Sequence, residues 1–366
     1  MSKFKVIQLL PELNIGGVER GTKDFSKVLV ERGHDSLVIS NGGVFEKDII
    51  EDGGKHINLP IHKKSLFSIR YASDLRDIYL SEKPDIVHVR SRMPAWINYF
   101  AYKKLSHKPL LVSTFHGLYS TPLYSQVMSK VDHIIAISKT VKDYIQGTYK
   151  VPNEKITVIP RGCDPEIFNK NPVEETWIKK WYEEFPQTQD KIILTMPTRI
   201  SKWKGVDSFI DLVNLLNDDN YHALIVGPTA KSKKSYLKQL QNKISNYGIE
   251  DKITITGSRN DISNIYKISD FVFNLSIKPE PFGRTTIEAI SSGSKVIGWN
   301  HGGTKEILEE LYPDGLVELD NIDDLAEKVI NLSNMTNSMP KENTFTSERM
   351  TNQTISLYQD LLAKRL

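Results

Sequence analysis

Short runs of apolar, often β-branched residues recur along the chain, separated by longer segments whose apolar residues follow a helical spacing. Strands that alternate with helical segments indicate parallel sheets with crossover helices. Runs that are apolar throughout fit strands covered on both faces. The expected strands are KVIQLL, SLVIS, DIVHV, LLVST, HIIAI and ITVIP in the first half, then KIILTM, ALIVG, KITIT, DFVFNL, KVIGW and GLVEL in the second.

The strand pattern stops between residues 170 and 190, in a polar segment interrupted by two prolines. Two domains fit the length of 366 residues, because domains cluster at roughly 100 to 200 residues. We therefore predict an α/β chain with two Rossmann-like, doubly wound domains that face a central cleft. The last segment has apolar residues at helical spacing and predicts a helix that packs back on the first domain. The predicted ranges are 1–172, 173–345 and, for the terminal helix, 346–366.

Charge is distributed unevenly along the chain. The formal net charge is +3, but residues 1–170 hold 25 Lys and Arg against 18 Asp and Glu, which leaves the remainder net negative. A basic first half indicates an anionic partner or an anionic membrane surface. The chain has no motif typical of nucleic-acid binding, and we expect no nucleic-acid partner.

The chain has a single cysteine, Cys163, which excludes internal disulfides and cysteine-cluster zinc sites and fits a reducing compartment. No apolar run approaches the roughly 20 residues of a membrane span, and the start of the chain lacks the pattern of a signal peptide. We therefore expect the protein in the cytoplasm. Peripheral contact with the inner face of the cytoplasmic membrane is a further hypothesis.

A glycine pair, Gly16 and Gly17, follows the first expected strand and precedes a helix. Backbone N–H groups at such a helix start can bind a phosphate, although a tight strand-to-helix turn explains the pair equally well. The sequence has neither GxGxxG nor the Walker GxxxxGKS/T pattern, which disfavours dehydrogenases and nucleoside triphosphatases.

Two cations, Arg199 and Lys204, stand in the loop TRISKWKG after the first expected strand of the second half. An apolar strand brings both to the ligand-binding edge of its sheet, where a guanidinium fork and an ammonium can neutralise a diphosphate. An ordinary basic surface loop is the alternative interpretation.

Two glutamates, Glu280 and Glu288, lie eight positions apart in EPFGRTTIEA. Glu280 precedes a proline, so we expect it in the loop after the strand DFVFNL. We expect the next helix to begin near Thr285. Glu288 would then either complete a capping box or hold a ribose diol.

Several motifs together resemble the family 4 glycosyltransferases, retaining enzymes of the GT-B fold, here of the bacterial lipopolysaccharide or surface-polysaccharide type. The spacing of Glu280 and Glu288 matches the E-x7-E signature of that family. In the first half, the motif VIPRGCD differs from the family pattern at Arg161, where the family more often has asparagine. The resemblance spans essentially the whole chain and is carried by GGVER, STFHG, IAIS and VIPRGCD, then by RISKWKG, TGSRNDI, EPFGRTTIEA and GGTKEIL.

The resemblance implies a role for residues in each motif. Arg199 and Lys204 would neutralise the donor diphosphate, and Glu288 would bind the ribose. Glu280 would contact the donor sugar, and His116, from the acceptor domain, would lie near the reacting sugar. The other donor-binding positions implied are Gly16, Gly17, Arg259, Ile262, Phe282, Gly283 and Arg284, with backbone N–H groups acting at the last three.

The resemblance also implies the reaction: a hexosyl group moves with retention from a nucleotide-diphosphate sugar to a glycan or lipid-linked glycan acceptor, by front-face attack of the acceptor hydroxyl. The sequence has no two aspartates two positions apart, so we expect no DxD metal site. Cations and a helix N-terminus would stabilise the leaving diphosphate instead. We therefore expect no metal and no cofactor, the nucleotide sugar being a substrate.

Residues 88–108 mix cations with aromatic residues. Such a helix suits contact with an anionic bilayer, whereas a crossover helix that packs its aromatic residues on the sheet explains the same pattern. Arg90 and Arg92, which follow an expected strand, could instead meet an anionic acceptor.

Two other function classes stay open. A sugar-nucleotide 2-epimerase has a similar two-domain architecture but needs its own arrangement of acid and base residues. A non-catalytic nucleotide-sugar-binding subunit needs only the binding residues. Product analysis without acceptor separates the first of these from a transferase, because an epimerase needs no acceptor.

Overall fold

The computed structural model describes residues 3–335 and 337–365, and the chain divides into two compact units. The first unit ends at Pro160 and takes in the chain again from Glu348, and the second covers Arg161–Ser347. This boundary comes before the predicted one at 172/173. The reason is that the segment around Cys163 forms a parallel β-bridge with Thr346 and so belongs to the second unit.

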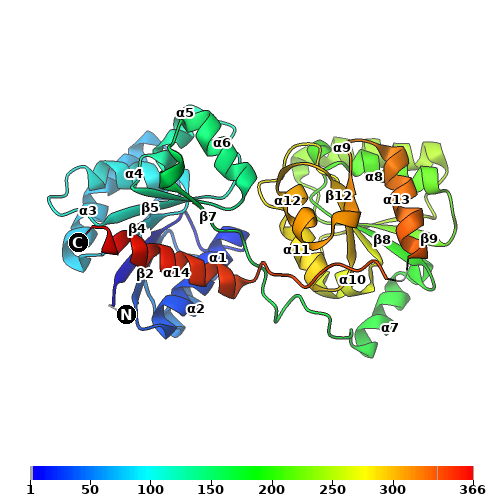
Figure 1. Cartoon of the computed structure of the whole chain (residues 1–366), viewed down its shortest axis with the longest axis horizontal. Coiled ribbons are helices and arrows are strands. Elements are labelled where there is room, and N and C mark those ends of the chain that lie inside the picture. The colour runs from blue at the N-terminus through cyan, green and yellow to red at the C-terminus, as the bar shows by residue number, and fades with distance from the viewer. Residues whose placement is uncertain (1–2, 336, 366) are drawn as a thin grey trace. The chain divides into compact units, whose positions relative to one another are not determined.

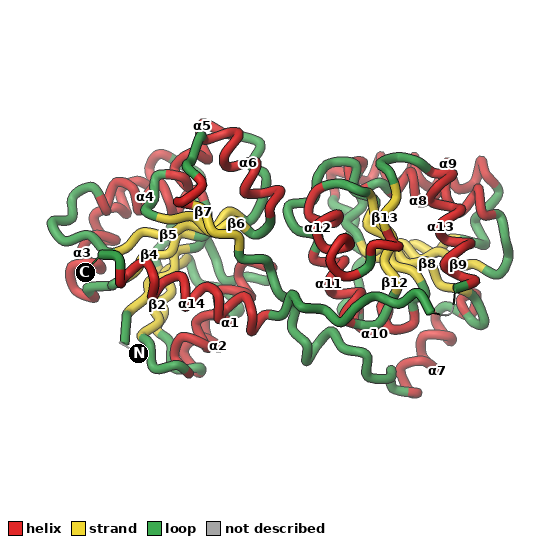
Figure 2. The backbone as a smooth tube through the Cα atoms, in the orientation of Figure 1, coloured by secondary structure: helices red, strands yellow, loops and turns green. Residues whose placement is uncertain are grey.

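A parallel sheet forms the centre of the first unit, and helices lie on both of its faces (Figure 2). Within the described residues its strand order is β3-β2-β1-β4-β5-β6-β7. The strands are β1 (Lys5–Leu9), β2 (Asp35–Ser40), β3 (Lys55–Asn58), β4 (Ile86–Val89), β5 (Leu110–Phe115), β6 (His133–Ala136) and β7 (Ile156–Val158). The helices are α1 (Gly17–Glu31), α2 (Glu46–Glu51), α3 (Tyr71–Glu82), α4 (Arg92–Tyr102), α5 (Pro122–Ser125), α6 (Lys139–Tyr149) and α14 (Ser347–Ala363), with 3-10 turns η1 (Leu66–Arg70), η2 (Gln126–Ser129) and η3 (Asn153–Lys155).

The second unit repeats this design with the strand order β10-β9-β8-β11-β12-β13 among the residues described. The strands are β8 (Ile192–Pro197), β9 (Tyr221–Val226), β10 (Ile253–Gly257), β11 (Phe271–Asn274), β12 (Lys295–Trp299) and β13 (Leu316–Val317). The helices are α7 (Glu175–Glu184), α8 (Val206–Leu216), α9 (Lys234–Tyr247), α10 (Ile262–Ile268), α11 (Arg284–Ser291), α12 (Gly302–Leu311) and α13 (Ile322–Asn334), with 3-10 turns η4 (Pro186–Thr188), η5 (Lys202–Lys204), η6 (Lys231–Lys233) and η7 (Pro313–Gly315). The predicted pair of doubly wound parallel sheets is therefore confirmed.

The terminal helix α14 packs on the first unit, beside α1 (Figure 1). Ile355 and Tyr358 are buried in one apolar cluster with Phe25 and Leu29 of α1 and with residues of the sheet. The Tyr358 hydroxyl also forms a 2.6 Å hydrogen bond with Nδ1 of buried His88. The last part of the chain therefore completes the core of the unit that the first part begins.

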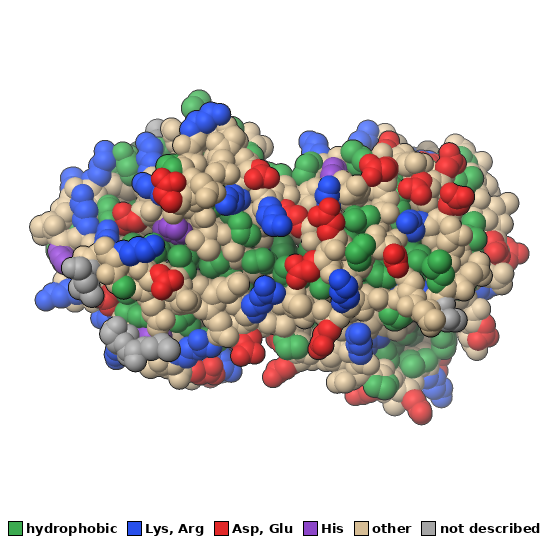
Figure 3. All heavy atoms as spheres, viewed as in Figure 1, with side chains coloured by type: hydrophobic (Ala, Val, Ile, Leu, Met, Phe, Trp, Pro, Cys, Tyr) green, Lys and Arg blue, Asp and Glu red, His purple; other side chains and the backbone are tan. Residues whose placement is uncertain are grey.

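Charge separates between the units as the sequence indicates. On the face shown in Figure 3, Lys and Arg side chains (blue) are frequent on the first unit, and Asp and Glu side chains (red) are more frequent on the second. No helix in the described ranges combines the length and the apolar character that a membrane crossing requires.

Three buried histidines pair with threonines of the neighbouring strand. The ring Nε2 atoms of His88, His133 and His222 lie 2.7, 2.8 and 2.8 Å from threonine hydroxyls on β5, β7 and β10. Burial lowers the pKa of each imidazole, and for His222 to about 4. These rings are therefore neutral in the folded protein at neutral pH.

The second unit should lose stability in mild acid. Between about pH 6.5 and pH 4 the unfolded chain binds a proton at His222 that the folded chain does not, so stability falls as the pH falls through 6.5. The loss should approach about 1.4 kcal/mol per pH unit for this one group. We expect His222→Asn to flatten the pH dependence of urea unfolding between pH 7 and pH 5. An unchanged slope in this variant contradicts the prediction.

Candidate active site

Two loops of the second unit meet at the carboxyl edge of its sheet. One follows β8 and carries Arg199 and Lys204, and the other follows β11 and carries Glu280. The strands β8 and β11 are neighbours, and the strand order reverses between them. Ligands of open parallel sheets bind at the carboxyl ends of the strands where the order reverses. The topology thus brings the predicted basic loop and the first glutamate to the ligand-binding edge.

Glu280 is held by two donors. The Lys204 ammonium donates a short hydrogen bond to Glu280 Oε1, and Ser276 Oγ donates to the same oxygen at 2.6 Å. The Lys204 side chain is 18% exposed and that of Glu280 is 11% exposed, so this ion pair is largely shielded from water. Lys204 also lies 4.2 Å from the centre of the Trp203 ring. The second oxygen, Oε2, makes no hydrogen bond to another described residue and is available to a ligand.

Two glycines allow the backbones around this pair to approach closely. Gly205 has φ +76°, and a Cβ there would lie 1.8 Å from the Leu275 carbonyl oxygen. Gly302 has φ +62°, and a Cβ there would lie 2.7 Å from the Glu280 amide nitrogen. The loops after β8, β11 and β12 can therefore pack against one another only because these positions lack a side chain.

The helices α11 and α12 both begin beside the loop that carries Glu280. The backbone N–H groups of Phe282, Gly283 and Arg284 form no hydrogen bond with any described residue. At α12, Gly303 N–H donates to the Glu280 carbonyl at 2.7 Å, while the buried hydroxyl of Thr304 has no partner among the described residues. Unpaired N–H groups at a helix start attract anions. The predicted donors at 282–284 are therefore available for a ligand.

Glu288 does not cap its helix, so the capping-box interpretation is wrong. The helix α11 begins at Arg284, one residue before the expected start, and its N-cap is Gly283 in the left-handed region. The Glu288 carboxylate instead accepts a 2.7 Å bond from Arg284. Burial raises the pKa of Glu288, and Arg284 opposes that shift. The alternative role, binding of a ribose diol, stays a prediction.

The other predicted cations differ in their surroundings. Arg199 is exposed, and its guanidinium forms no hydrogen bond, ion pair or cation–π contact with the described residues. Arg259 is held by a bidentate pair with Asp261, at 2.8 and 3.0 Å, and by Glu184 at 2.8 Å. These carboxylates raise its pKa. Ile262 opens α10 and packs on the cluster around Trp181. Arg199 is therefore free for a ligand, whereas Arg259 serves first to anchor its loop.

The first unit places its candidate residues at the carboxyl edge of its own sheet. His116 directly follows β5, and Gly16 and Gly17 open α1 after β1. A Cβ on Gly16 would lie 2.1 Å from the Glu19 carboxylate, which thus sits at the helix start. Arg90 is buried and its Nε donates to Gln8 Oε1 at 2.9 Å, so its contact with an acceptor stays a prediction.

Sequence reasoning missed some residues of this site. Ser276 and His301 matter because Ser276 Oγ bonds Glu280 and its carbonyl lies 2.7 Å from His301 Nε2. Gly302 could have been found, since a glycine pair between a strand and a helix carries the same signal as Gly16 and Gly17. Ser276 has no such signal. In the described ranges no three His, Cys, Asp or Glu side chains are grouped so that they could hold a metal ion.

Both halves of the chain match known glycosyltransferases. Residues 15–167 match the model of Glycosyltransferase Family 4, and residues 178–348 match the model of Glycosyl transferases group 1. The crystal structure of a glycosyltransferase from Rickettsia africae ESF-5 is 30% identical to this chain, covers 99% of both chains and has a TM-score of 0.86. The expected GT-B architecture is confirmed by these matches.

Two relatives are more distant. Anabaena Alr3699/HepE, solved in complex with UDP and glucose, is 19% identical, covers 98% of this chain and 100% of its own, and has a TM-score of 0.79. The UDP-Gal:alpha-D-GlcNAc-diphosphoundecaprenol alpha-1,3-galactosyltransferase of Escherichia coli is 24% identical over 91% of this chain and 88% of its own. The similarity of the Anabaena structure to this chain shows that the two proteins share a fold.

The close approach at Gly302 can be tested by adding one methyl group. We expect Gly302→Ala to destabilise the second unit by about 1–3 kcal/mol, because alanine disfavours φ +62° and would meet the Glu280 backbone. A matched control is Gly147→Ala in α6, where a Cβ meets nothing within 4 Å and helix propensity should improve. Urea unfolding measures both, and equal stabilities of Gly302→Ala and wild type contradict the prediction.

Proposed function

We propose that this chain, which belongs to the family 4 glycosyltransferases of the GT-B fold, is a retaining, metal-independent enzyme that acts on a nucleotide-diphosphate sugar. It moves a hexosyl group to a glycan or lipid-linked glycan acceptor by front-face attack of the acceptor hydroxyl. We place this reaction in the synthesis of a bacterial lipopolysaccharide or surface polysaccharide, on the cytoplasmic side of the membrane.

The observation that carries the proposal is the buried pair of Lys204 and Glu280 beside the open start of α11. When the donor bond breaks, negative charge develops on the diphosphate and positive charge on the sugar. Lys204, exposed Arg199 and the N–H groups at 282–284 offer positive potential for the first charge. Glu280 Oε2 offers an acceptor for sugar hydroxyls. These groups do the work that a divalent cation would otherwise do, which supports metal independence.

The relatives support the substrate classes. The Anabaena protein of the same fold was solved with UDP and glucose, and the Escherichia coli relative uses a UDP-sugar and a diphosphoundecaprenol-linked acceptor. His116 would act from the first unit, which would bind the acceptor. It directly follows β5 and so lies at the carboxyl edge of the sheet, where ligands of such sheets bind. Front-face attack without a covalent intermediate fits the placement of Glu280, because its Oε1 already accepts from Lys204 and Ser276 and these bonds make the carboxylate a weaker nucleophile.

A lipid-linked acceptor also requires access to a membrane, and the first unit has a surface suited to it. Phe67 and Leu123 are 84% and 82% exposed. Phe67 belongs to η1, which contacts the aromatic helix α4. Leu123 belongs to α5, which contacts η2, and η2 in turn contacts α4. An apolar cavity of about 360 Å³ lies in the same region, lined by Lys64, Ser65, Ile69, Met93, Trp96, Phe100 and Tyr124. Exposed apolar side chains among lysines are the composition that binds anionic bilayers.

Removal of the diphosphate-binding charge should slow transfer. We expect Arg199→Ala and Lys204→Ala each to lower the rate of sugar transfer by roughly 10² or more, the scale of losing one preorganised charge. Lys202→Ala is the matched control, because Lys202 is an exposed cation of the same turn. Transfer is followed from a labelled UDP-sugar to a lipid-linked glycan, with the anomeric configuration of the product read by NMR.

Near-wild-type turnover in both variants contradicts the assigned roles. An inverted product contradicts retention, and activity that disappears with EDTA and returns with Mg²⁺ contradicts metal independence. Conversion of the donor sugar without any acceptor would indicate the epimerase alternative.

Membrane contact is tested separately. We expect Phe67→Ser to weaken pelleting with phosphatidylglycerol vesicles about threefold to tenfold, because one exposed aromatic side chain would no longer enter the bilayer interface. Ile50→Ser is the control, since Ile50 is also exposed but lies on α2. Equal pelleting of wild type and Phe67→Ser, or none by wild type at low salt, contradicts the membrane-binding surface.

A further inference from the structure

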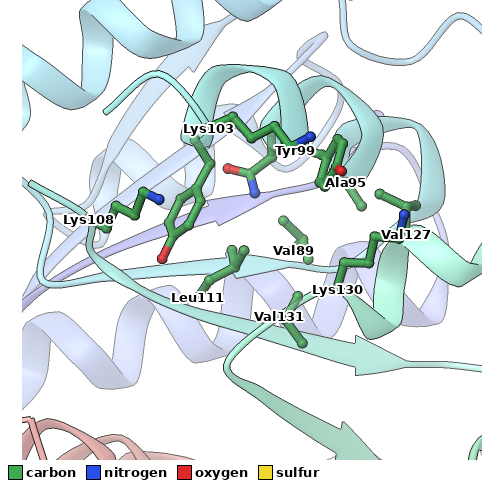
Figure 4. Close-up of a pocket in the computed structure, with 11 residues that line it drawn as sticks. Val89, Ala95, Tyr99, Lys103, Lys108, Leu111, Val127, Lys130 and Val131 are labelled. Carbon is green, nitrogen blue, oxygen red and sulfur yellow. The ribbon is translucent and has the colours of Figure 1, made fainter. Parts of the chain in front are cut away.

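A second cavity, separate from the one lined by Trp96 and Phe100, lies between α4 and the sheet of the first unit. Its volume is about 210 Å³. Val89 and Leu111 of the sheet and Val131 form its apolar floor. The lysines that line it are Lys103, Lys108 and Lys130 (Figure 4). A volume below the roughly 300–1,000 Å³ of sites for drug-sized ligands limits the occupant to a small molecule or a small part of a larger one.

Three lysines surround this cavity without a counter-charge. Lys103 and Lys130 extend toward Tyr99, with their ammonium groups 4.5 and 5.1 Å from the centre of the same ring (Figure 4). Lys108 lies at the other end, 5.5 Å from the Tyr102 ring. Within the described ranges none of the three forms an ion pair. Two ammonium groups beside one ring repel each other, and an anion between them would relieve that repulsion.

The one acidic neighbour in this part of the sequence is already bonded elsewhere. Asp132 follows Val131, and its Oδ2 accepts bonds from the Leu111 amide at 2.8 Å and from Arg365 at 2.9 Å. The hydrogen bond from Lys103, together with the charges of Lys103 and Lys130, also lowers the pKa of the Tyr99 hydroxyl, although its slight burial acts in the opposite direction. The local potential at the opening is therefore positive.

A buried polar group completes the site. Asn98 lines the cavity and is 2% exposed. Its Oδ1 accepts a 2.7 Å bond from the Tyr79 hydroxyl, and its Nδ2 donates to no described residue. Nδ2 keeps some accessible surface, so an acceptor atom in the cavity can reach this donor. The cavity thus offers cations and one fixed donor above an apolar floor.

The site does not belong to the substrate-binding edge of its sheet. Lys108 precedes β5, which begins at Leu110, and Lys130 precedes β6, which begins at His133. Strands of a parallel sheet all start at the same edge, so these lysines lie at the amino edge. His116 follows the end of β5 and lies at the carboxyl edge. A ligand held by these lysines would therefore leave the carboxyl edge accessible.

We propose that this cavity binds an organic phosphate monoester, with the phosphate between Lys103, Lys130 and the Asn98 amide, and a short apolar substituent against Val89, Leu111 and Val131. Phosphate carries nearly two charges at neutral pH and three acceptor oxygens, which matches several ammonium groups and an amide donor better than a carboxylate does. The apolar floor excludes a purely inorganic occupant as the best ligand. The inference is independent of the sugar-transfer reaction.

Calorimetric titration of the full chain with butyl phosphate tests the site. We expect the double variant Lys103→Gln/Lys130→Gln to bind at least tenfold more weakly than wild type, with an unchanged unfolding midpoint because both side chains are exposed. Lys104→Gln is the matched control: Lys104 is the adjacent exposed lysine but does not line the cavity, and its variant should bind as wild type does. Lys204→Ala should also leave this affinity unchanged, which separates the site from the candidate active site.

A second arm identifies the source of the phosphate. Inorganic phosphate should bind at least tenfold more weakly than butyl phosphate, because it leaves the apolar floor empty. If the double variant also loses binding to phosphatidic acid vesicles, the phosphate comes from a lipid headgroup; if it keeps that binding, the source is a soluble ester. Equal affinity of wild type and double variant for butyl phosphate, or equal affinity of wild type for butyl and inorganic phosphate, overturns the proposal.

Discussion

The candidate active site depends on one buried carboxylate, that of Glu280. Lys204 comes from the loop after β8 and Ser276 from the loop after β11, and both donate to the same Glu280 oxygen. The pair therefore ties together the two loops at the point where the strand order reverses. Breaking a buried ion pair by removing one partner costs about 3–5 kcal/mol, so each partner fixes the other. The position of the ligand-binding groups follows from this contact.

The backbone around the pair is arranged for an anion. Gly205 and Gly302 let neighbouring loops pack so closely that a Cβ at either position would collide with the backbone of the facing loop. The backbone N–H groups at the start of α11 have no partner among the described residues. These groups and Lys204 are held in place before a ligand arrives. Preorganised dipoles of this kind need no rearrangement when charge develops, which is why they can stabilise a leaving diphosphate more effectively than water can.

Much of this could be predicted from the sequence, for reasons that are local. The expected apolar runs correspond to strands because buried parallel strands must be apolar on both faces. The strand β3 was missed because KHIN, at the edge of its sheet, has a single aliphatic residue. The capping box at Glu288 was wrong because a four-residue pattern cannot reveal the competing bond from Arg284. The anchoring of Arg259 by Glu184 depends on a contact between positions 75 residues apart, which no local pattern contains.

The central claim is that the loops around Glu280 bind a nucleoside diphosphate, and a thermal-shift titration with UDP, GDP, ADP and NAD tests it most directly. One nucleoside diphosphate at about 100 times its dissociation constant should stabilise the wild type by about 2.7 kcal/mol. Lys204→Ala, compared with its own ligand-free state, should lose most of that effect. Stabilisation by none of the diphosphates, by NAD alone, or to the same extent in Lys204→Ala would contradict the account.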